Sequence, residues 1–302
     1  MKIGYPCINW TIGCKGDRTF RLKSYSERRL IETVTNNLNC LAAMLAFNVD
    51  HDLLFFRITS DLVPFASHPV CQFDWVMYFK NKLASIGEFI KSNNIRISMH
   101  PGQYTVLNSH DSDILTRSIK ELQYHSDVLD ALGLDTSAKI QLHIGGVYGD
   151  KNKSIQRFIE RYFKLEETTR QRLVIENDDR SYTVEDCMRI YGETGVPILF
   201  DVFHHELHNS GSSMVNVLDT VMKTWQPHDG IPMVDYSYHH TSGLKMRHIE
   251  SIDGSHFKRF LTTTQPYDFD IMLEIKDKET SAIKAVQIAR KDMRFSYGQP
   301  TS

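Results

Sequence analysis

Short hydrophobic runs alternate along the chain with longer segments in which apolar residues recur every three or four positions. The short runs are rich in Ile, Val, Leu and Phe, a composition typical of parallel strands that are buried on both faces. Eight such runs are predicted as strands, at residues 2–9, 53–59, 95–100, 139–144, 172–177, 197–204, 232–237 and 270–275.

The segments between these strands have the period of amphipathic helices. The first carries apolar residues on one face at Leu30, Val34, Leu38, Leu41 and Leu45. Further helices are predicted at 73–92, 113–132, 153–166, 183–194, 213–224, 254–263 and 279–292. Eight strand-then-helix units without a linker predict an α/β fold, a single (β/α)₈ TIM barrel over residues 1–295, with a flexible tail at 296–302. A doubly wound open sheet is the alternative.

Composition places few limits on the function. The chain of 302 residues has 35 Lys and Arg against 37 Asp and Glu, and its net charge of −2 neither requires nor excludes nucleic acid. We expect no membrane span and no signal peptide, because no apolar run is long enough. The five cysteines are odd in number and form no CxxC motif, which predicts a reduced cytoplasmic protein without disulfides.

Residues that bind metals or transfer protons stand at the ends of six successive predicted strands. They are His100, His143, Glu176, Asp201 with His204, Asp235 and Glu274. His68 and His248 follow in the loops after the second and seventh strands. A single histidine or carboxylate at such a position is usually structural. In a (β/α)₈ barrel, however, all strands end at one face, where active sites form, so six in succession predict one shared site.

This set of side chains predicts a polynuclear metal centre. Four buried carboxylates side by side are costly unless cations neutralise them. Protonation or lysine partners are alternatives, but histidine together with carboxylate is the ligand set of Zn²⁺ or Mn²⁺. His239 and His240, in the loop after the seventh strand, are interpreted as solvated.

The predicted mouth of the barrel also carries residues suited to nucleic acid. Metals bridged by carboxylates suit hydrolysis of a phosphate ester, although the same ring could bind a sugar and shift a hydride or proton. The loop after the first strand contains Lys15, Arg18, Arg21 and Lys23. It either favours a phosphate substrate or is an ordinary solvated loop. Tyr5, Trp10 and Tyr104 near the mouth can stack on exposed bases or simply pack.

Nine short motifs spread over residues 1–294 resemble those of the UV damage endonucleases. They are GYPCIN (4–9), FRI (56–58), PFASHP (64–69), SMHPGQY (98–104), LHIGG (142–146), IEND (175–178), FDVFHH (200–205), VDYS (234–237) and MLEIKDKE (272–279). Each motif alone is weak, but together they are highly specific.

The resemblance implies a TIM barrel related in design to endonuclease IV that carries a cluster of divalent metals. It implies a DNA repair enzyme that nicks duplex DNA immediately 5′ to UV photoproducts and leaves a 3′-hydroxyl and a 5′-phosphate. The metal ligands that it implies are His100, His143, Glu176, Asp201, His204, Asp235, His248 and Glu274. Glu176 would bridge two metals.

The resemblance also implies roles around the metals. His68 would contact phosphate or metal and take part in catalysis with His100, His143 and Glu176. Gln103 and Tyr104 would form a wedge that enters the duplex at the lesion. Tyr5 and Asn9 would line the pocket for the extruded bases. Lys15 and Arg18 are expected to contact DNA because they belong to the basic loop after the first strand. Base extrusion costs a few kcal/mol and less at a damaged site, so recognition could rest on how easily the duplex deforms.

Two positions depart from some members of the family. Some have His where this chain has Asp235, and Lys where it has Met233. Carboxylate is a harder ligand than imidazole, so we expect two or three divalent ions, Mn²⁺ first, with Zn²⁺ or Mg²⁺ as alternatives. The expected partner is damaged double-stranded DNA, and no membrane is expected to take part. We expect a monomer that resides in the cytoplasm and associates with the nucleoid when it acts on DNA.

Three other functions remain open from the sequence. The first is an abasic-site endonuclease of the endonuclease IV type. The second is a sugar isomerase or epimerase on a xylose isomerase-like barrel, which would not need the basic loop after the first strand. The third is a catalytically silent sensor of DNA damage, which would gain little from a nearly complete set of metal ligands.

Overall fold

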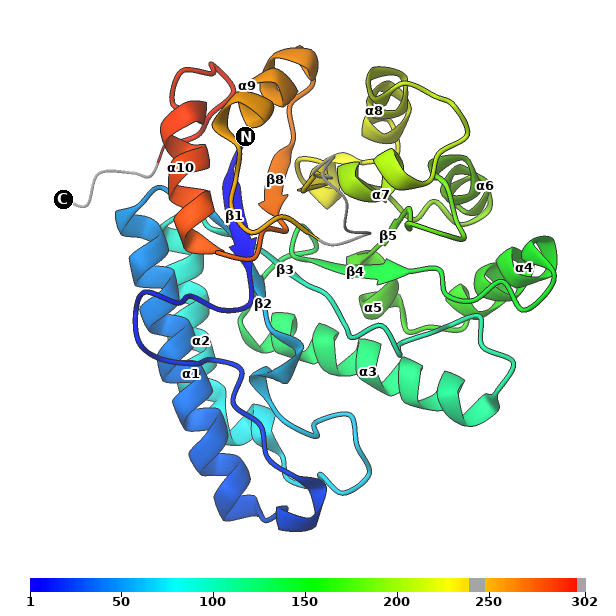
Figure 1. Cartoon of the computed structure of the whole chain (residues 1–302). Helices are drawn as coiled ribbons and strands as arrows, with labels where there is room; N and C mark the ends of the chain where they lie inside the picture. Colours follow the sequence, from blue (N-terminus) through cyan, green and yellow to red (C-terminus); the bar gives the residue numbers. More distant parts are fainter. Residues whose placement is uncertain (239–247, 298–302) are drawn as a thin grey trace.

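Eight parallel strands form a closed barrel in the computed structural model, which describes residues 1–238 and 248–297 (Figure 1). The strands pair in chain order, and β1 closes the ring by pairing with β8. They are β1 (Ile3–Pro6), β2 (Phe55–Ile58), β3 (Arg96–Met99), β4 (Lys139–His143), β5 (Leu173–Glu176), β6 (Ile198–Asp201), β7 (Met233–Tyr236) and β8 (Asp270–Leu273). The predicted (β/α)₈ barrel is confirmed, and the open-sheet alternative is wrong.

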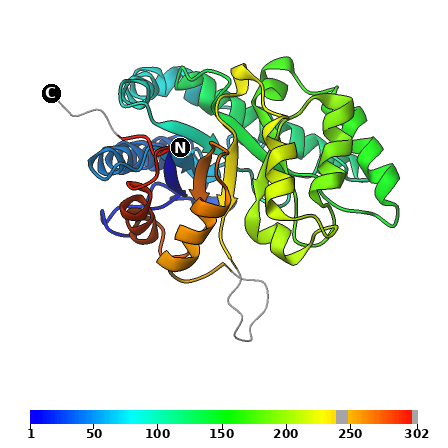
Figure 2. The ribbon, with the colours of Figure 1, turned by 90° about the horizontal axis from the view of Figure 1, so that it is seen from above.

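Helices surround the strands in both views of the chain (Figure 1, Figure 2). The α-helices are α1 (Glu27–Asp50), α2 (Trp75–Ser92), α3 (Ser112–Ala131), α4 (Lys151–Tyr162), α5 (Glu167–Arg172), α6 (Val184–Thr194), α7 (Val202–Leu207), α8 (Met214–Met222), α9 (Gly254–Thr263) and α10 (Glu279–Ala289). The 3₁₀ helices are η1 (Leu22–Ser24), η2 (Ser60–Leu62) and η3 (Pro227–Asp229). Several α-helices begin after a side chain that accepts a first-turn N–H, as at Ser26, Asp74, Asp111, Asp150 and Asp253.

The sixth strand is shorter than the predicted run of residues 197–204. It ends at Asp201, whose side chain accepts the backbone N–H of His204 at 2.8 Å and so caps α7. A carboxylate that satisfies a first-turn donor starts a helix even inside a hydrophobic run. The pattern also did not predict α5, which is too short to show a helical period.

The inward-facing residues of the strands form layers, because alternate residues of a strand face the same side. A buried apolar layer consists of Phe55, Val174, Leu199, Met233 and Met272, together with Trp225. Two residues further along the same five strands are Arg57, Glu176, Asp201, Asp235 and Glu274. The period of two therefore brings these polar side chains above the apolar layer, at the carboxyl end of the barrel.

Buried ion pairs occupy the opposite end of the barrel. Arg96 Nη1 lies 3.0 Å from Asp270 Oδ2, and Lys139 Nζ lies 2.5 Å from Asp229 Oδ1. The charged groups in these two pairs therefore neutralise each other at the amino end of the barrel.

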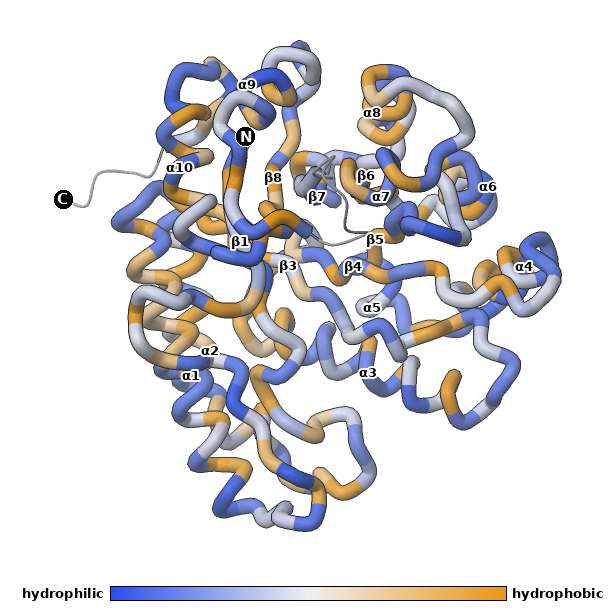
Figure 3. The backbone as a smooth tube through the Cα atoms, in the orientation of Figure 1, coloured by the Kyte–Doolittle hydropathy of each residue, from blue (hydrophilic) through white to orange (hydrophobic). Residues whose placement is uncertain are grey.

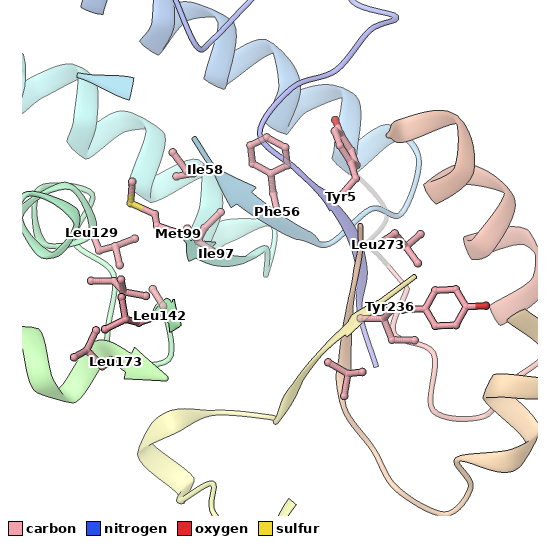
Figure 4. Close-up of a cluster of buried hydrophobic side chains, with 14 of the residues drawn as sticks. Tyr5, Phe56, Ile58, Ile97, Met99, Leu129, Leu142, Leu173, Tyr236 and Leu273 are labelled. Atoms are coloured by element: carbon pink, nitrogen blue, oxygen red, sulfur yellow. The ribbon is translucent and has the colours of Figure 1, made fainter. Parts of the chain in front are cut away.

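Outward-facing strand residues pack against the helices in the main hydrophobic core (Figure 4). Examples are Phe56, Ile58, Ile97, Met99 and Leu142, each no more than 2% exposed. Burial of one such side chain stabilises the fold by about 1.5–3 kcal/mol. Hydrophobic positions accordingly recur on the strands and on one side of helices such as α10 (Figure 3). The core therefore lies mainly between the barrel and its helices.

Cys14 and Cys40 form a disulfide, so the prediction of a fully reduced chain is wrong. The loop after β1 runs back along α1, where Asn36 Nδ2 donates to the carbonyl of Lys15 at 3.0 Å. This path brings together two cysteines that are 26 positions apart. Cysteine counting cannot show such a contact, because it depends on the path of the loop. The other three cysteines are free.

Only the first part of the predicted tail belongs to the described residues, and it contacts the barrel. Ser296 N donates to the carbonyl of Met1 at 2.9 Å, and Tyr297 Oη donates to the carbonyl of Arg290 at 3.0 Å. Residues 298–302 lie outside the described part of the chain. Within residues 1–238 and 248–297, no helix has the length and apolar character that crossing a membrane requires.

Candidate metal centre

The strand ends bring histidine and carboxylate side chains together at the carboxyl end of the barrel. Three groups have ligand atoms within 4.8 Å of one another, namely His100, His143 and Glu176; Glu176, Asp201 and His204; and Asp201, Asp235 and Glu274. Because Glu176 and Asp201 are shared, the groups form one cluster. His248 joins it through Nε2, which lies 3.4 Å from Glu274 Oε2. All eight predicted ligands thus lie together, and their role as ligands stays a prediction.

Several atoms of this cluster face one another without hydrogen bonding. His100 Nε2 and His143 Nδ1 each lie 3.1 Å from Glu176 Oε1. Neither contact has hydrogen-bond geometry, and Glu176 Oε1 has no hydrogen-bond partner among the described residues. Lone pairs that converge around a carboxylate only 1% exposed are what a cation site requires. The donors present therefore fit a divalent metal.

The start of α7 orients Asp201 and His204. Asp201 Oδ2 lies 3.3 Å from His204 Nδ1. The side chain of Asn177 makes two hydrogen bonds to the backbone of Asp201. Its Nδ2 donates to the carbonyl of Asp201, and its Oδ1 accepts the N–H of Asp201. His204 Nδ1 lies 3.0 Å from the carbonyl of Asn177, and donation to that carbonyl leaves Nε2 of the same ring free for a metal.

A buried arginine, Arg57, contacts the carboxylates on the other side of the cluster. Its Nη2 lies 2.8 Å from both side-chain oxygens of Asp235, and its Nη1 donates to Glu274 Oε1. Gln141 Nε2 donates to Glu176 Oε2 and to Asp235 Oδ2, each at 2.7 Å. A network of hydrogen bonds therefore links the arginine to the proposed bridging carboxylate.

Sequence reasoning did not identify Arg57 and Gln141 as parts of the site. The available signal was a charged residue inside the hydrophobic run LLFFRIT, because a buried arginine requires anionic partners. Gln141 interrupts the run KIQLHI in the same way, two residues before His143. The strand period places both side chains on the inner face of the barrel.

Burial and neighbouring charges set the protonation states of the histidines. Burial lowers the pKa of His143 and of His248, so both imidazoles are neutral at pH 7 and have a lone pair for a metal. Burial opposes the charge on His204 as well, but Asp201 and Glu176 outweigh it and raise the pKa of His204 to about 9. In the metal-free protein His204 is therefore protonated at neutral pH.

His68 lies outside these metal-ligand groups, in the loop between β2 and α2. Its side chain is exposed, and Nδ1 accepts the N–H of Val70 at 3.0 Å. Together with Gln103 and Tyr104 it lines a surface cavity of about 500 Å³. His68 is thus close to the predicted wedge, and its role in catalysis stays a prediction.

Gln103 and Tyr104 stand at the tip of a tight turn after β3. Thr105 N donates to the carbonyl of Gly102 at 2.9 Å, which closes a four-residue turn around them. The side chain of Tyr104 is 83% exposed, whereas Thr105 is buried. A projecting ring on an anchored turn has the form expected of a wedge.

Tyr5 and Asn9, which are predicted to contact extruded bases, are buried in the chain without DNA. Tyr5 is 0% exposed, and its hydroxyl donates to Asn48 Oδ1 of α1 at 2.7 Å and accepts from Asn9 Nδ2 at 2.9 Å. Tyr5 pairs with Phe56 across the sheet, so its ring lies on the outer face of β1. The strand period thus directs the ring toward α1, and the contact of Tyr5 and Asn9 with extruded bases stays a prediction.

Lys15 and Arg18 are exposed on the loop that follows β1, as is Trp10 with 58% of its surface. The backbone of Arg18 is held by the side chain of Asn37 on α1. Their contact with DNA stays a prediction. His239 and His240, which the sequence assigned to a solvated loop, lie outside the described residues.

Comparison with known proteins shows the family of this chain. The family model described as "UV-endonuclease UvdE" matches residues 1–295. The UV DNA damage endonuclease of Clostridium perfringens (strain 13 / Type A) is 40% identical over 288 residues, which are 95% of this chain and 70% of that protein. The crystal structure of SacUVDE is similar with a TM-score of 0.92 at 44% identity, over 96% of this chain and 98% of that chain.

A more distant likeness concerns the fold alone. Endonuclease IV from Thermus thermophilus has a TM-score of 0.59 at 14% identity, over 83% of this chain and 93% of that chain. The expected relation in design to endonuclease IV is confirmed at the level of the barrel. The family match, in contrast, extends over nearly the whole sequence and includes the strand ends that carry the cluster. The chain therefore belongs to the UV-endonuclease UvdE family and is an endonuclease.

Proposed function

We propose that this endonuclease recognises UV photoproducts in duplex DNA and cleaves the phosphodiester immediately 5′ to the lesion, leaving a 3′-hydroxyl and a 5′-phosphate. The observation that carries the proposal is the cluster of histidines and carboxylates at the carboxyl end of the barrel, in a chain whose relatives are named UV DNA damage endonucleases. The exposed wedge beside that cluster supports a substrate whose bases leave the stack.

The cluster would hold divalent ions, Mn²⁺ first and Zn²⁺ or Mg²⁺ as alternatives. A mixture of imidazole and carboxylate donors suits these ions. When bound, they neutralise charge on the phosphate and lower the pKa of the attacking water. Glu176 would bridge two of them, because it belongs to two of the candidate ligand groups.

The protein's own residues would orient the phosphodiester for hydrolysis. Oxygen from water bonds to phosphorus, the bond from phosphorus to O3′ breaks, and O3′ takes a proton. His68, exposed beside the wedge, would contact the scissile phosphate. Lys15 and Arg18 would contact neighbouring phosphates, which makes affinity fall as salt rises.

Gln103 and Tyr104 would insert into the duplex where the damaged bases leave the stack. A lesion already weakens stacking and pairing, so extrusion costs less there than in intact DNA. The exposed ring of Tyr104 would replace part of the lost stacking. Selection would then depend on the deformability of the duplex and not on base-specific hydrogen bonds.

Nicking of supercoiled plasmid tests the proposal. UV-irradiated plasmid should be nicked in the presence of Mn²⁺, unirradiated plasmid should remain intact, and EDTA should abolish the reaction. Equal nicking of depurinated plasmid would point to an abasic-site enzyme. Absence of nicking with Mn²⁺, Mg²⁺ or Zn²⁺, in folded and metal-loaded protein, would contradict a nuclease of this kind.

Mapping the cut tests the position and the ends. A duplex oligonucleotide with one cyclobutane dimer, labelled at its 5′ end, should give a single fragment that ends directly before the dimer. DNA ligase should reseal the nick, since it requires a 3′-hydroxyl and a 5′-phosphate. A cut on the 3′ side, or ends that ligase cannot join, would overturn the proposed chemistry.

A further inference from the structure

Lys278 directly precedes α10, whose first turn lies beside the end of β1 (Figure 1). Its backbone has a φ of 50° and a ψ of −116°, in a region that residues other than glycine rarely adopt. A cation is also disfavoured at the start of a helix by the helix dipole, and the side chain makes no capping hydrogen bond. Neither the turn nor the helix therefore explains why this residue is a lysine, and strained positions of this kind concentrate at functional sites.

The side chain of Lys278 is half-buried next to the histidine–carboxylate cluster. Its ammonium interacts electrostatically with Glu274, Arg57 and His248. Burial lowers the pKa of Lys278, so the ammonium is only partly hydrated. The charge therefore lies close to the cluster, in a place where water screens it less than at the surface.

The acidic side chains beside Lys278 are bonded to other groups. Glu274 pairs with Arg57 through Oε1, and Glu279 Oε1 accepts the backbone N–H of Trp10 at 3.0 Å. Within residues 1–238 and 248–297, Lys278 Nζ has neither an ion pair nor a hydrogen bond. The lysine thus brings a positive charge to the mouth of the barrel without a partner among these residues.

An ammonium in this state points to an anionic ligand. Lys139, which is buried at the other end of the barrel, has fixed partners in Asp229 and the carbonyl of Gln171. Partial removal from water without such a partner is costly, and a bound anion relieves that cost. Lys278 is therefore placed to gain more from an anion than a fully hydrated lysine would.

The anion that reaches this part of the cluster is the phosphate of the substrate. The side chains of Glu274 and His248 are 19% and 35% exposed, whereas Glu176 is 1% exposed, so the cluster is open on the side of Lys278. A phosphodiester carries one negative charge, and attack by hydroxide raises this to two at the five-coordinate phosphorus. A fixed cation at its oxygens stabilises that state more than the substrate.

We propose that Lys278 is a catalytic residue whose ammonium donates a hydrogen bond to a non-bridging oxygen of the scissile phosphate. The inference rests on the proposed function, because it takes a DNA phosphodiester as the substrate. Lys278 keeps its protons throughout the reaction. Oxygen from water bonds to phosphorus and the bond to O3′ breaks, while the ammonium offsets the charge that grows on the oxygen it contacts.

Nicking under single-turnover conditions tests the role of the lysine. Lys278→Met should lower the rate at saturating protein by about 100-fold, as expected for loss of one donor to a transition-state oxygen. Its manganese content should stay unchanged, and the Kd for a duplex with one dimer should rise by no more than about tenfold, because other phosphate contacts remain. Lys278→Arg, which restores a cation, should recover most of the rate.

Lys276→Met is the matched control for this experiment. It removes an exposed lysine of the same loop, which pairs with Glu250, and should nick at the wild-type rate. A wild-type rate in Lys278→Met, or a fall in rate that accompanies loss of manganese, would overturn the inference.

Inorganic phosphate tests the contact separately from nicking. Calorimetric titration of the manganese-loaded full chain should give a phosphate Kd at least about tenfold higher for Lys278→Met than for the wild type and Lys276→Met. Equal Kd values would overturn the inference even in a protein that nicks irradiated plasmid. The expected phosphate binding without any nicking would overturn the proposed function alone.

A crystal structure of the wild type with phosphate decides if Lys278→Met does not fold. Lys278 Nζ should lie within about 3.2 Å of a phosphate oxygen at the cluster. Phosphate bound at the cluster beyond hydrogen-bond distance of Nζ would contradict the assignment.

Discussion

Glu176 Oε1 lies 3.1 Å from His143 Nδ1 in the interior of the barrel mouth, and the two atoms do not form a hydrogen bond. Two polar atoms at this distance without a shared proton leave a buried carboxylate oxygen unsatisfied, which costs about 1–3 kcal/mol or more for a charged group. A divalent cation between them removes that cost. We therefore expect the proposed metal centre to depend strongly on Glu176.

Glu176→Gln should abolish the bridge while keeping the size of the side chain. We expect loss of at least one bound manganese ion and a fall in nicking of irradiated plasmid by about 100-fold or more, since a metal ligand contributes at least as much as the groups behind it. Metal analysis and plasmid nicking measure the two effects. Glu193→Gln, in an exposed part of α6, is the control. Wild-type nicking by Glu176→Gln would remove Glu176 from the mechanism.

Alanine substitution of Gln103 and Tyr104 should weaken binding to damaged duplex without changing metal content. Aromatic stacking on a base contributes about 1–3 kcal/mol, so loss of the ring corresponds to roughly 5- to 150-fold in Kd. Fluorescence anisotropy with a duplex that contains one dimer measures the change. Tyr78→Ala removes an exposed ring from α2 and should have no effect. Unchanged discrimination between damaged and intact duplex would contradict the wedge.

Manganese affinity should rise with pH. The pKa of His204 is raised to about 9 in the metal-free protein, so below that pH a proton must leave before the ring can bind a metal. Affinity should therefore increase from about pH 6.5 to about pH 8.5, by at most about tenfold per unit for one proton. Calorimetry in two buffers of different ionisation enthalpy should report net proton release. In His204→Asn the slope should become shallower, and a flat profile in the wild type would contradict the assignment.

Reduction of the disulfide should destabilise the protein. Cys14 and Cys40 are 26 positions apart, and closing a loop of that length contributes about 3 kcal/mol through the unfolded state. Urea unfolding of Cys40→Ser, compared with the wild type, measures the loss. Cys71→Ser changes a free cysteine and is the control. Equal stability of the two variants would show that the bridge contributes nothing.

Two glycines in helices should respond oppositely to alanine. A Cβ atom on Gly87 of α2 would lie 1.7 Å from the carbonyl oxygen of Leu132, so Gly87→Ala must push apart the packed backbones, at a cost of about 1–3 kcal/mol. A Cβ atom on Gly192 of α6 meets nothing within 4 Å, and Gly192→Ala should stabilise by about 0.5–1 kcal/mol. Thermal melting of both variants measures the difference. Similar melting temperatures would contradict this account of Gly87.

The sequence was sufficient to predict the barrel and most of the cluster, because both follow from local periods. A period of two along each strand puts Val174 and Glu176, or Leu199 and Asp201, on the same face. Eight alternating strand-and-helix units then favour a barrel in which these faces meet, and the structure shows that the sheet closes. The same periods predict that His100 and His143 stand at the ends of their strands.

Tertiary structure alone decided which distant groups meet. The pairing of Arg57 with Asp235, the bridge between Cys14 and Cys40, and the burial of Tyr5 against α1 all join residues far apart in the sequence. Local patterns encode which face a side chain takes, but not which distant partner lies opposite. That choice depends on the register of the barrel and the paths of its loops, which the packing of the whole chain determines.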